Sequence, residues 1–287
     1  MDTHVVIMAG GVGSRLFPIS TPERPKQFID LLKVGKTLIQ LTVERFLPIC
    51  PLENIWVVTS EKYIHFIREQ IPGIKPSHIL AEPEARNTAP CIAYACTKIA
   101  AHHPNVNIVV TPSDAYIADK ENFVDTIKTA LDFTTENSRI VTLGIVPTRP
   151  ATEYGYIEAG KTVLRPIKKV LSFKEKPSVE VAQDYLSKGN YFWNAGIFIW
   201  NQATIDAQLR KFAPGIMVQM DKIKGHLYSP GESDALRVYF PQCEKISIDY
   251  AVMEKSNDIF MIPCTFLWSD LGSFPTLEEI QSKLAKV

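Results

Sequence analysis

Short apolar runs rich in β-forming residues alternate with longer amphipathic stretches through the first half of the chain, and this alternation constrains the fold most. The runs that predict strands cover residues 4–9, 54–60, 78–81, 107–111 and 139–145. Helices are predicted between them, over residues 37–46, 61–70, 88–102 and 120–136. This order is typical of βαβ units. It predicts an α/β, Rossmann-like fold whose mixed, mostly parallel central sheet is flanked by helices.

The pattern changes after Pro150 and becomes mixed. Strands are predicted over 154–159, 163–174 and 192–200, with a turn at Gly160-Lys161 between the first two, and helices over 179–188, 202–212 and 247–255. Short strands near Ile259 and Phe266 and a helix after Pro275 are expected to complete the chain. Because no internal repeat or low-complexity linker separates the halves, we expect one domain over 1–287, divided into residues 1–150, 151–272 and a helix over 273–287.

Charge and cysteine content limit the classes of partner. The chain has 31 basic and 31 acidic residues, so no net field would attract nucleic acid or an anionic membrane. Its five cysteines are spread without a C-x-x-C pair, which favours neither a disulfide framework nor a zinc site. No apolar run approaches the ~20 residues of a membrane helix, and the run at 5–9 is typical of a strand rather than a signal peptide. We therefore expect a reduced, cytoplasmic protein.

A glycine-rich segment, Gly10-Gly-Val-Gly-Ser-Arg-Leu16, directly follows the first predicted strand. Glycines at the carboxyl end of a parallel strand let backbone N–H groups approach phosphate oxygens. The third glycine of the dinucleotide fingerprint and the Gly-Lys-Ser/Thr of the P-loop are both missing, so this is a different phosphate loop. Arg15 and Lys26 lie close by and supply cations, whereas a glycine turn alone could equally be a solvated connection.

Seven ordered segments resemble the sugar nucleotidyltransferases, specifically mannose-1-phosphate guanylyltransferases. They are the glycine loop followed by Arg24-Pro-Lys-Gln-Phe28, then Glu82-Pro-Glu-Ala-Arg-Asn-Thr-Ala-Pro90, Thr111-Pro-Ser-Asp114, Glu153-Tyr-Gly-Tyr-Ile-Glu158, Phe173-Lys-Glu-Lys-Pro177, Trp193-Asn-Ala-Gly-Ile-Phe198 and Trp268-Ser-Asp-Leu-Gly272. One departure is Ala115, where the family commonly has histidine. The resemblance implies a nucleotidyltransferase fold with a smaller, β-rich sugar-binding subregion, and a minimal catalytic domain with a short tail.

The implied reaction is attack by the phosphate oxygen of mannose 1-phosphate on the α-phosphorus of GTP, which gives GDP-mannose and pyrophosphate. Two anions must be brought together, so positioning and charge neutralisation dominate. The resemblance assigns catalytic roles to Arg15, Lys26, Asp114 and Lys176. Nucleotide binding falls to Gly10, Gly11, Gly13, Ser14, Arg86, Asn87 and Thr88, in the half over 1–150.

Mg²⁺ is the expected cofactor, with Asp114 and Asp270 as its ligands by resemblance. Asp114 follows the predicted strand 107–111, and its carboxylate is a hard oxygen ligand suited to this ion. Taken alone, Ser113-Asp114 would more often cap a turn. The expected partners are GTP and mannose 1-phosphate, without nucleic acid or a membrane, and a homodimer is left open.

The sugar-phosphate half, residues 151–272, is assigned Tyr154, Gly155, Glu175 and Asn194 for the sugar by the same resemblance. Taken alone, Glu175-Lys176 before Pro177 would more often be a solvated strand end, and Asn194-Ala-Gly196 would more often be a bulge or turn. Arg86, Asn87 and Thr88 open a predicted helix, and they suit helix caps as well as an anionic ligand.

Three alternatives stay open beside this prediction. The chain could use another sugar 1-phosphate, such as glucose or a heptose, or another nucleotide. It could be a regulatory subunit that binds a nucleotide sugar without turnover, although such a subunit would be expected to lose Arg15, Lys26, Asp114, Lys176 or Asp270. A nicotinamide-dependent dehydrogenase is disfavoured by the missing glycine and by the lack of an acidic residue ending the second strand.

Overall fold

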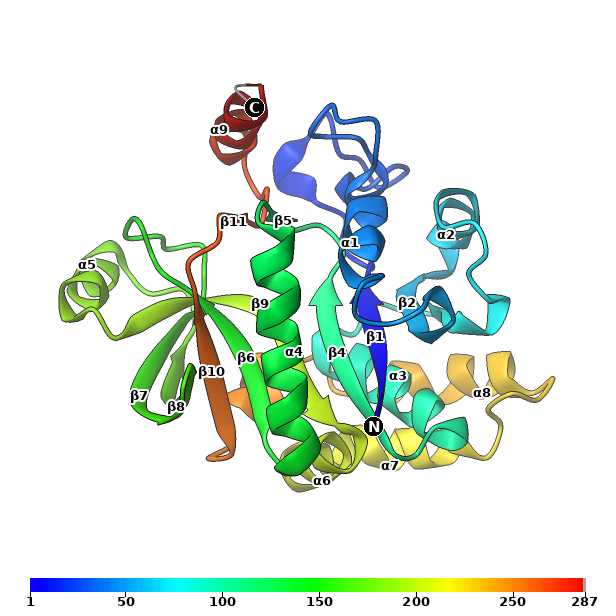
Figure 1. The fold of residues 1–287 in the computed structure, drawn as a ribbon. Helices are drawn as coiled ribbons and strands as arrows, with labels where there is room; N and C mark the ends of the chain where they lie inside the picture. The colour runs from blue at the N-terminus through cyan, green and yellow to red at the C-terminus, as the bar shows by residue number, and fades with distance from the viewer. Residues whose placement is uncertain (286–287) are drawn as a thin grey trace.

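A nine-stranded sheet crosses the whole molecule in the computed structural model, which describes residues 1–285 (Figure 1). The strand order is β3-β2-β1-β4-β9-β6-β10-β8-β7. The bounds are β1 Asp2–Met8, β2 Ile55–Ser60, β3 Ile79–Glu82, β4 Val106–Pro112, β6 Ile140–Ile145, β7 Tyr156–Leu164, β8 Ile167–Lys174, β9 Tyr191–Asn201 and β10 Ile259–Cys264. Only β8 and β9 run against the other strands. The predicted α/β class with a mixed, mostly parallel sheet is confirmed.

Strand β9 joins the two halves of the chain within this sheet. It pairs antiparallel with β4 from the first half and with β6, and it also pairs with β7. A second, two-stranded sheet pairs β5 (Tyr116–Ile117) with β11 (Trp268–Ser269). This small sheet brings the segments after Asp114 and before Asp270 together, although they are far apart in the sequence.

Helices cover both faces of the large sheet. The bounds are α1 Leu38–Phe46, α2 Ile64–Gln70, α3 Thr88–His102, α4 Lys120–Glu136, α5 Val179–Lys188, α6 Gln202–Phe212, α7 Pro214–Lys224, α8 Glu232–Tyr239 and α9 Phe274–Leu284. In Figure 1, α1 and α4 lie in front of the sheet, with α3, α6 and α7 behind it. The predicted helices at 88–102, 120–136, 179–188 and 202–212 match these bounds. Residues 286–287 of the predicted C-terminal helix lie outside the described residues.

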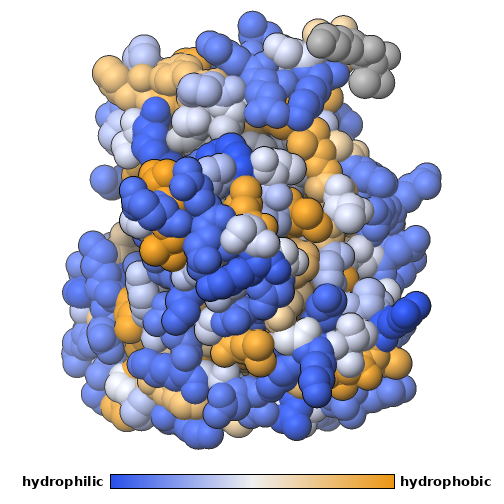
Figure 2. Space-filling model, turned by 90° about the vertical axis from the view of Figure 1, so that its left-hand side faces the viewer, coloured by the Kyte–Doolittle hydropathy of each residue, from blue (hydrophilic) through white to orange (hydrophobic). Residues whose placement is uncertain are grey.

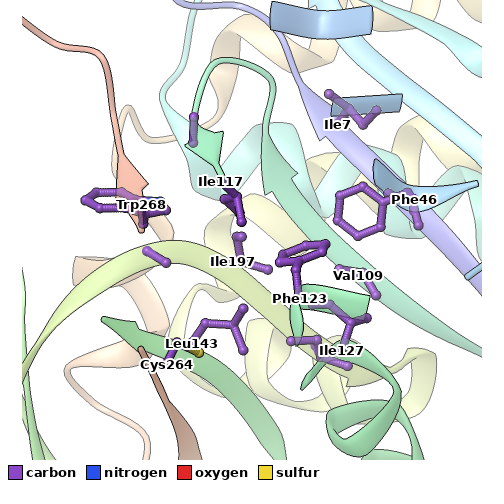
Figure 3. Packing of buried hydrophobic residues seen from close by; sticks show 14 of the residues in the cluster. Ile7, Phe46, Val109, Ile117, Phe123, Ile127, Leu143, Ile197, Cys264 and Trp268 are labelled. Carbon is purple, nitrogen blue, oxygen red and sulfur yellow. The ribbon is translucent and has the colours of Figure 1, made fainter. Parts of the chain in front are cut away.

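The core follows the two-residue period of the strands. Val5 and Ile7 of β1 face the cluster that includes α1 and α4, whereas Val6 faces the cluster that includes α3 and α6. Figure 3 shows Phe46 and Phe123 packed on the first face, and their rings lie 5.4 Å apart edge to face. Burial on both faces explains why the central strands are nearly continuous apolar runs.

The face that carries α5 and the β7–β8 hairpin is mostly hydrophilic, with separate hydrophobic patches (Figure 2). The hairpin contributes exposed Val163, Leu164 and Leu171. Most of the other large apolar side chains are buried in the core. None of the helices described over residues 1–285 is long and apolar enough to cross a membrane.

Two local predictions were wrong. The turn between β7 and β8 lies at Arg165-Pro166 rather than at Gly160-Lys161, because the irregular register of this hairpin absorbs Gly160 within β7. The helix predicted over 247–255 is a π-helix over Asp249–Met253. Helices α7 and α8 and strand β5 were not predicted.

Candidate functional site

The glycine loop follows the carboxyl end of β1, and two side chains hold it by donating to backbone carbonyls in and next to the loop. Gln27 Nε2 donates to the carbonyls of Ala9 (3.0 Å) and Gly11 (2.8 Å), and Ser20 Oγ donates to that of Val12 (2.9 Å). Gly10, Gly11, Ser14 and Arg15 are exposed. The backbone of the loop is thus fixed on the side of Gln27 and Ser20, while these four residues are open to solvent.

Gly13 lies directly over the stem of Lys26. Its φ of 65° is in the left-handed region, and a β-carbon there would come within 2.9 Å of Lys26 Cγ and Ser20 Oγ. Glycine is required here both for the backbone conformation and for the close approach.

Lys26 is buried and connects the two predicted metal ligands. Its Nζ forms an ion pair with Asp114 Oδ2 (3.1 Å) and donates to the backbone carbonyl of Asp270 (2.6 Å). Lys26 and Asp270 are 244 residues apart in the chain. The ammonium therefore draws the loop after β4 and the segment after β11 to one point beneath the glycine loop.

Asp270 is oriented by three further groups. Its Oδ2 forms an ion pair with Arg15 Nη2 (3.3 Å), and its Oδ1 accepts from the Tyr154 hydroxyl (2.9 Å) and the Gly272 N–H (3.0 Å). Burial raises the pKa of Tyr154, and the charge of Asp270 raises it further. Tyr154, predicted at the sugar, thus acts as a protonated donor to Asp270.

A cavity of about 240 Å³ opens beside these groups. Its lining includes Gly13, Arg15, Lys26, Asp114 and Gly272. Two cations and a carboxylate face one small polar space, an arrangement suited to an anionic ligand with a bound cation.

Asp114 and Asp270, which Lys26 draws together, offer hard oxygen donors of the kind that Mg²⁺ takes. Over the described part of the chain, no group of three or more His, Cys, Asp or Glu side chains is arranged to hold a metal. Mg²⁺ typically takes only one or two protein carboxylates and completes its shell with water and substrate phosphates. The donor set is therefore compatible with Mg²⁺ and unlike a closed structural metal site.

A second cluster forms where β7 begins and β8 ends. The register pairs Tyr156 with both Lys174 and Trp193, which brings Gly155, Glu175 and Asn194 to one place. The Asn194 N–H donates to the Gly155 carbonyl (2.8 Å), and a β-carbon on Gly155 would lie 2.4 Å from Glu175 Oε1. Glycine at 155 thus makes room for the Glu175 carboxylate.

The strand β9 is irregular at this point, and the irregularity orients Asn194. The pairing with β6 shifts between Thr142 and Gly144, and Gly196 has a φ of 70°. The Gly196 N–H donates to Asn194 Oδ1 (3.1 Å). Asn194 therefore lies in a bulge, and its side chain is directed by that bulge.

Asp249 completes this cluster and was missed from the sequence. Its Oδ1 accepts from Asn194 Nδ2 (2.9 Å). Burial raises the pKa of Asp249 and that of Glu175, and the charge of Lys176 opposes both shifts. Lys176 itself is exposed and has a left-handed φ of 43°. Asp249 begins the π-helix Asp249–Met253, and such turns are frequent at functional sites. This signal is visible in the structure, but sequence periodicity does not reveal it.

Arg86, Asn87 and Thr88 form a loop that opens α3. Asn87 is the N-cap, and its side chain accepts from the Thr88 N–H (2.8 Å). Arg86 forms an ion pair with Glu84 (3.2 Å), and Thr88 Oγ1 accepts from the Ile248 N–H (2.8 Å). Thr88 thus joins the start of α3 to the segment before Asp249. Over residues 1–285, no hydrogen bond or ion pair links these three residues to the Lys26 cluster.

Glu82 lies between the glycine loop and α3, and no role was predicted for it from the sequence. A β-carbon on Gly10 would lie 3.3 Å from Glu82 Oε2. Burial raises the pKa of Glu82 to about 7, and a hydrogen bond with Cys91 partly offsets that shift. Its Oε1 is buried and has no hydrogen-bond partner among residues 1–285.

Comparison with known proteins identifies the family of the chain. The chain matches the family model of nucleotidyl transferases over residues 4–287. It is 36% identical to mannose-1-phosphate guanylyltransferase RfbM of Salmonella typhimurium and 35% identical to mannose-1-phosphate guanylyltransferase of Escherichia coli K12. These matches cover 97% and 99% of this chain but only 58% and 60% of the two relatives. The chain thus spans less than two thirds of the length of these relatives.

A solved structure extends the similarity to three dimensions. The crystal structure described as mannose-1-phosphate geranyltransferase from Thermus thermophilus superposes with a TM-score of 0.89 at 34% identity. The match covers 98% of this chain and 80% of that one. On the family match, this fold and these relatives, the chain belongs to the nucleotidyl transferase family.

Proposed function

We propose that this protein transfers GMP from GTP to α-D-mannose 1-phosphate, giving GDP-mannose and pyrophosphate. One observation carries the proposal: the buried Lys26 draws Asp114 and Asp270 together beneath an exposed glycine loop. The choice of GTP and mannose is supported by the relatives named mannose-1-phosphate guanylyltransferase.

In this reaction, a phosphate oxygen of the sugar phosphate attacks the α-phosphorus of GTP. A new P–O bond forms, the bond between the α-phosphorus and the bridging oxygen breaks, and pyrophosphate leaves with the electron pair. We assign the exposed glycine loop, with Gly10, Gly11, Gly13 and Ser14, to the triphosphate. Arg15 would neutralise the departing pyrophosphate, and Lys26 the α-phosphate.

Asp114 and Asp270 are the residues that would hold Mg²⁺. When bound, the ion would supply Lewis-acid neutralisation of phosphate charge. The Tyr154 hydroxyl, which donates to Asp270 Oδ1, would help to orient this carboxylate towards the ion. Arg15 and Lys26, which now compensate the two carboxylates, would then be available to substrate phosphates.

The second cluster is proposed to bind the sugar. Glu175 and Asn194 offer acceptors and a donor to hydroxyl groups, and Lys176 is an exposed cation suited to the sugar phosphate. Arg86, Asn87 and Thr88 are assigned to the nucleoside, at the positively polarised start of α3.

Pyrophosphate release tests the proposal. The purified protein would be assayed with Mg²⁺, crossing mannose, glucose and heptose 1-phosphates against GTP, ATP, UTP, CTP and dTTP. Mannose 1-phosphate with GTP should turn over best, and EDTA should abolish the reaction. A different best pair would refute the assigned substrates, and no turnover with any pair would favour a regulatory subunit.

Two variants test the metal ligands. Asp114→Asn and Asp270→Asn should each lower turnover by about 100-fold, the scale of losing one preorganised electrostatic group. They should also weaken binding of Mn²⁺, measured by electron paramagnetic resonance in the presence of GTP. Asp206→Asn is the matched control, because Asp206 pairs with Arg210 on the surface (2.9 Å).

A further inference from the structure

The segment over residues 246–249 lies between the two clusters to which we assign the nucleoside and the sugar. The Ile248 N–H donates to Thr88 Oγ1 (2.8 Å), and the Ala89 N–H donates to the Ile246 carbonyl (3.1 Å). One residue further on, Asp249 accepts from Asn194 (2.9 Å). The start of α3 and the sugar cluster are thus joined through one short piece of chain.

Asp249 fixes the one side-chain amide of the sugar cluster. Asn194 Oδ1 accepts from Gly196, and one Nδ2–H donates to Asp249 Oδ1. Together, these two hydrogen bonds fix the orientation of the Asn194 side-chain amide, because one requires the oxygen and the other the nitrogen at a given place. The second Nδ2–H is left for a ligand. Without Asp249, only the Gly196 bond would restrain the amide.

The partly buried position of Asp249 is unfavourable for a carboxylate, and packing alone does not explain it. A carboxylate is difficult to bury, and the Asp249 side chain is held on a π-helical turn, which is rare in proteins. The groups that face it come from three segments: the charged Glu175 and Lys176 after β8, the charged Glu254 after the π-helix, and the neutral Asn194 amide of β9. An apolar residue could fill this space without the repulsion of Glu175 and Glu254.

We propose that Asp249 is a positioning residue of the sugar-phosphate site, and that it acts by holding the Asn194 amide towards the sugar hydroxyls. This inference rests on the function proposed above. It implies that Asp249 affects the affinity for the sugar phosphate through Asn194 and has little effect on the nucleotide. An acceptor at position 249, rather than its charge, is what the hydrogen bond requires.

The test compares Asp249→Ala, Asp249→Asn, Asn194→Ala and the double variant Asp249→Ala/Asn194→Ala. Asp249→Ala should raise KM for mannose 1-phosphate about tenfold, the scale of one buried hydrogen bond, and change KM for GTP less than twofold. Asp249→Asn retains an acceptor oxygen and should recover most of the loss. The double variant should be no worse than Asn194→Ala, because the two residues act through one contact. Asp206→Ala is the surface control.

Direct binding of mannose 1-phosphate, measured by titration calorimetry, separates this inference from the proposed function. If the wild-type protein shows no turnover with GTP, the proposed function fails, and calorimetry still ranks the variants. The inference is overturned if Asp249→Ala leaves sugar-phosphate affinity unchanged or weakens both substrates equally. Losses that add in the double variant would overturn it as well. If Asp249→Ala does not fold, Asp249→Asn provides the test. The inference is then contradicted if Asp249→Asn loses as much sugar-phosphate affinity as Asn194→Ala.

Discussion

Lys26 illustrates how one side chain organises the candidate site. Its ammonium is buried between the Asp114 carboxylate and the Asp270 carbonyl, and its stem supports Gly13. A buried cation that is fully paired fixes its partners, and removing it leaves those partners unpaired. We therefore expect the role of Lys26 in ordering the site and its role towards phosphate to be inseparable.

Lys26→Ala should lower turnover by about 100-fold or more, because it removes a preorganised charge and frees Asp114 and Asp270. Steady-state pyrophosphate release at saturating substrates measures this. Lys36→Ala and His102→Ala should be nearly silent, since Lys36 pairs with Glu44 at the surface and His102 is exposed and stacks on Tyr228. Near-normal turnover in Lys26→Ala would show that the site is wrongly assigned.

Glu82 makes the stability depend on pH in a defined direction. Its pKa is raised by burial to about 7 in the folded protein, whereas an unfolded glutamate titrates near 4.5. Between these values the folded state binds more protons, so this contribution to stability is present at low pH and is lost as pH rises through about 7. Relative to Glu82→Gln, the wild type should lose about 2 kcal/mol of unfolding free energy from pH 5 to pH 8. Urea unfolding of both proteins at the two pH values measures the difference, and a constant difference would contradict it.

At the scale of elements, hydrophobic periodicity predicted the regular strands and helices, and it missed the bulged hairpin and the π-helix. The strands β1, β2, β4 and β6 and the helices α3, α4, α5 and α6 were located within one or two residues, because their apolar positions repeat with a clear period. The turn predicted at Gly160-Lys161 was misplaced because glycine is common both in turns and in bulged strands. The π-helix at Asp249–Met253 looks like an ordinary helix in sequence, which is why Asp249 was missed.

The cap of α3 can be tested by its backbone. Asn87 has φ 68° and ψ −173°, a region that is unfavourable for residues with a β-carbon. Asn87→Ala should destabilise the protein by about 2 kcal/mol, and Asn87→Gly by about 1 kcal/mol less, because glycine adopts this conformation freely. Midpoints of urea unfolding at fixed pH compare the two. At the Asn201 cap of α6, where φ is −86°, glycine should have only the smaller advantage over alanine that it has at any N-cap; an equal advantage at both caps would argue against backbone strain at Asn87.

At the scale of the whole molecule, the site is assembled from residues that the sequence could name but could not bring together. Motif resemblance identified Lys26, Asp114 and Asp270, and the topology was needed to show that Lys26 holds the other two. The link from Thr88 through Ile248 and Asp249 to Asn194 involves contacts between residues up to 160 positions apart. Such contacts have no local pattern, so sequence reasoning could not have found them.

The opposite end of the sheet holds a histidine cluster that should control acid stability. Trp56 Nε1 donates to His4 Nδ1 (2.9 Å), and the Trp56 ring stacks on His78 with centroids 3.6 Å apart. Burial lowers the pKa of His4 to about 4, with further lowering by His103 and His78, and burial likewise lowers the pKa of His78 to about 4. These histidines lie where β1 to β3 begin, away from the glycine loop at the end of β1.

Unfolded histidine titrates near 6.5, so between pH 6.5 and 4 the unfolded state binds more protons than the folded state. The contribution of His4 to stability is therefore complete above pH 6.5 and is lost as pH falls towards 4. It should decrease by about 2 kcal/mol between pH 7 and pH 5. His4→Gln, which retains an acceptor for Trp56, removes this titration. Because Glu82 shifts stability the opposite way over the same range, the two proteins must be compared at each pH by tryptophan-monitored urea unfolding. If the wild type loses no more stability than His4→Gln on going from pH 7 to pH 5, His4 is not the acid-sensitive group.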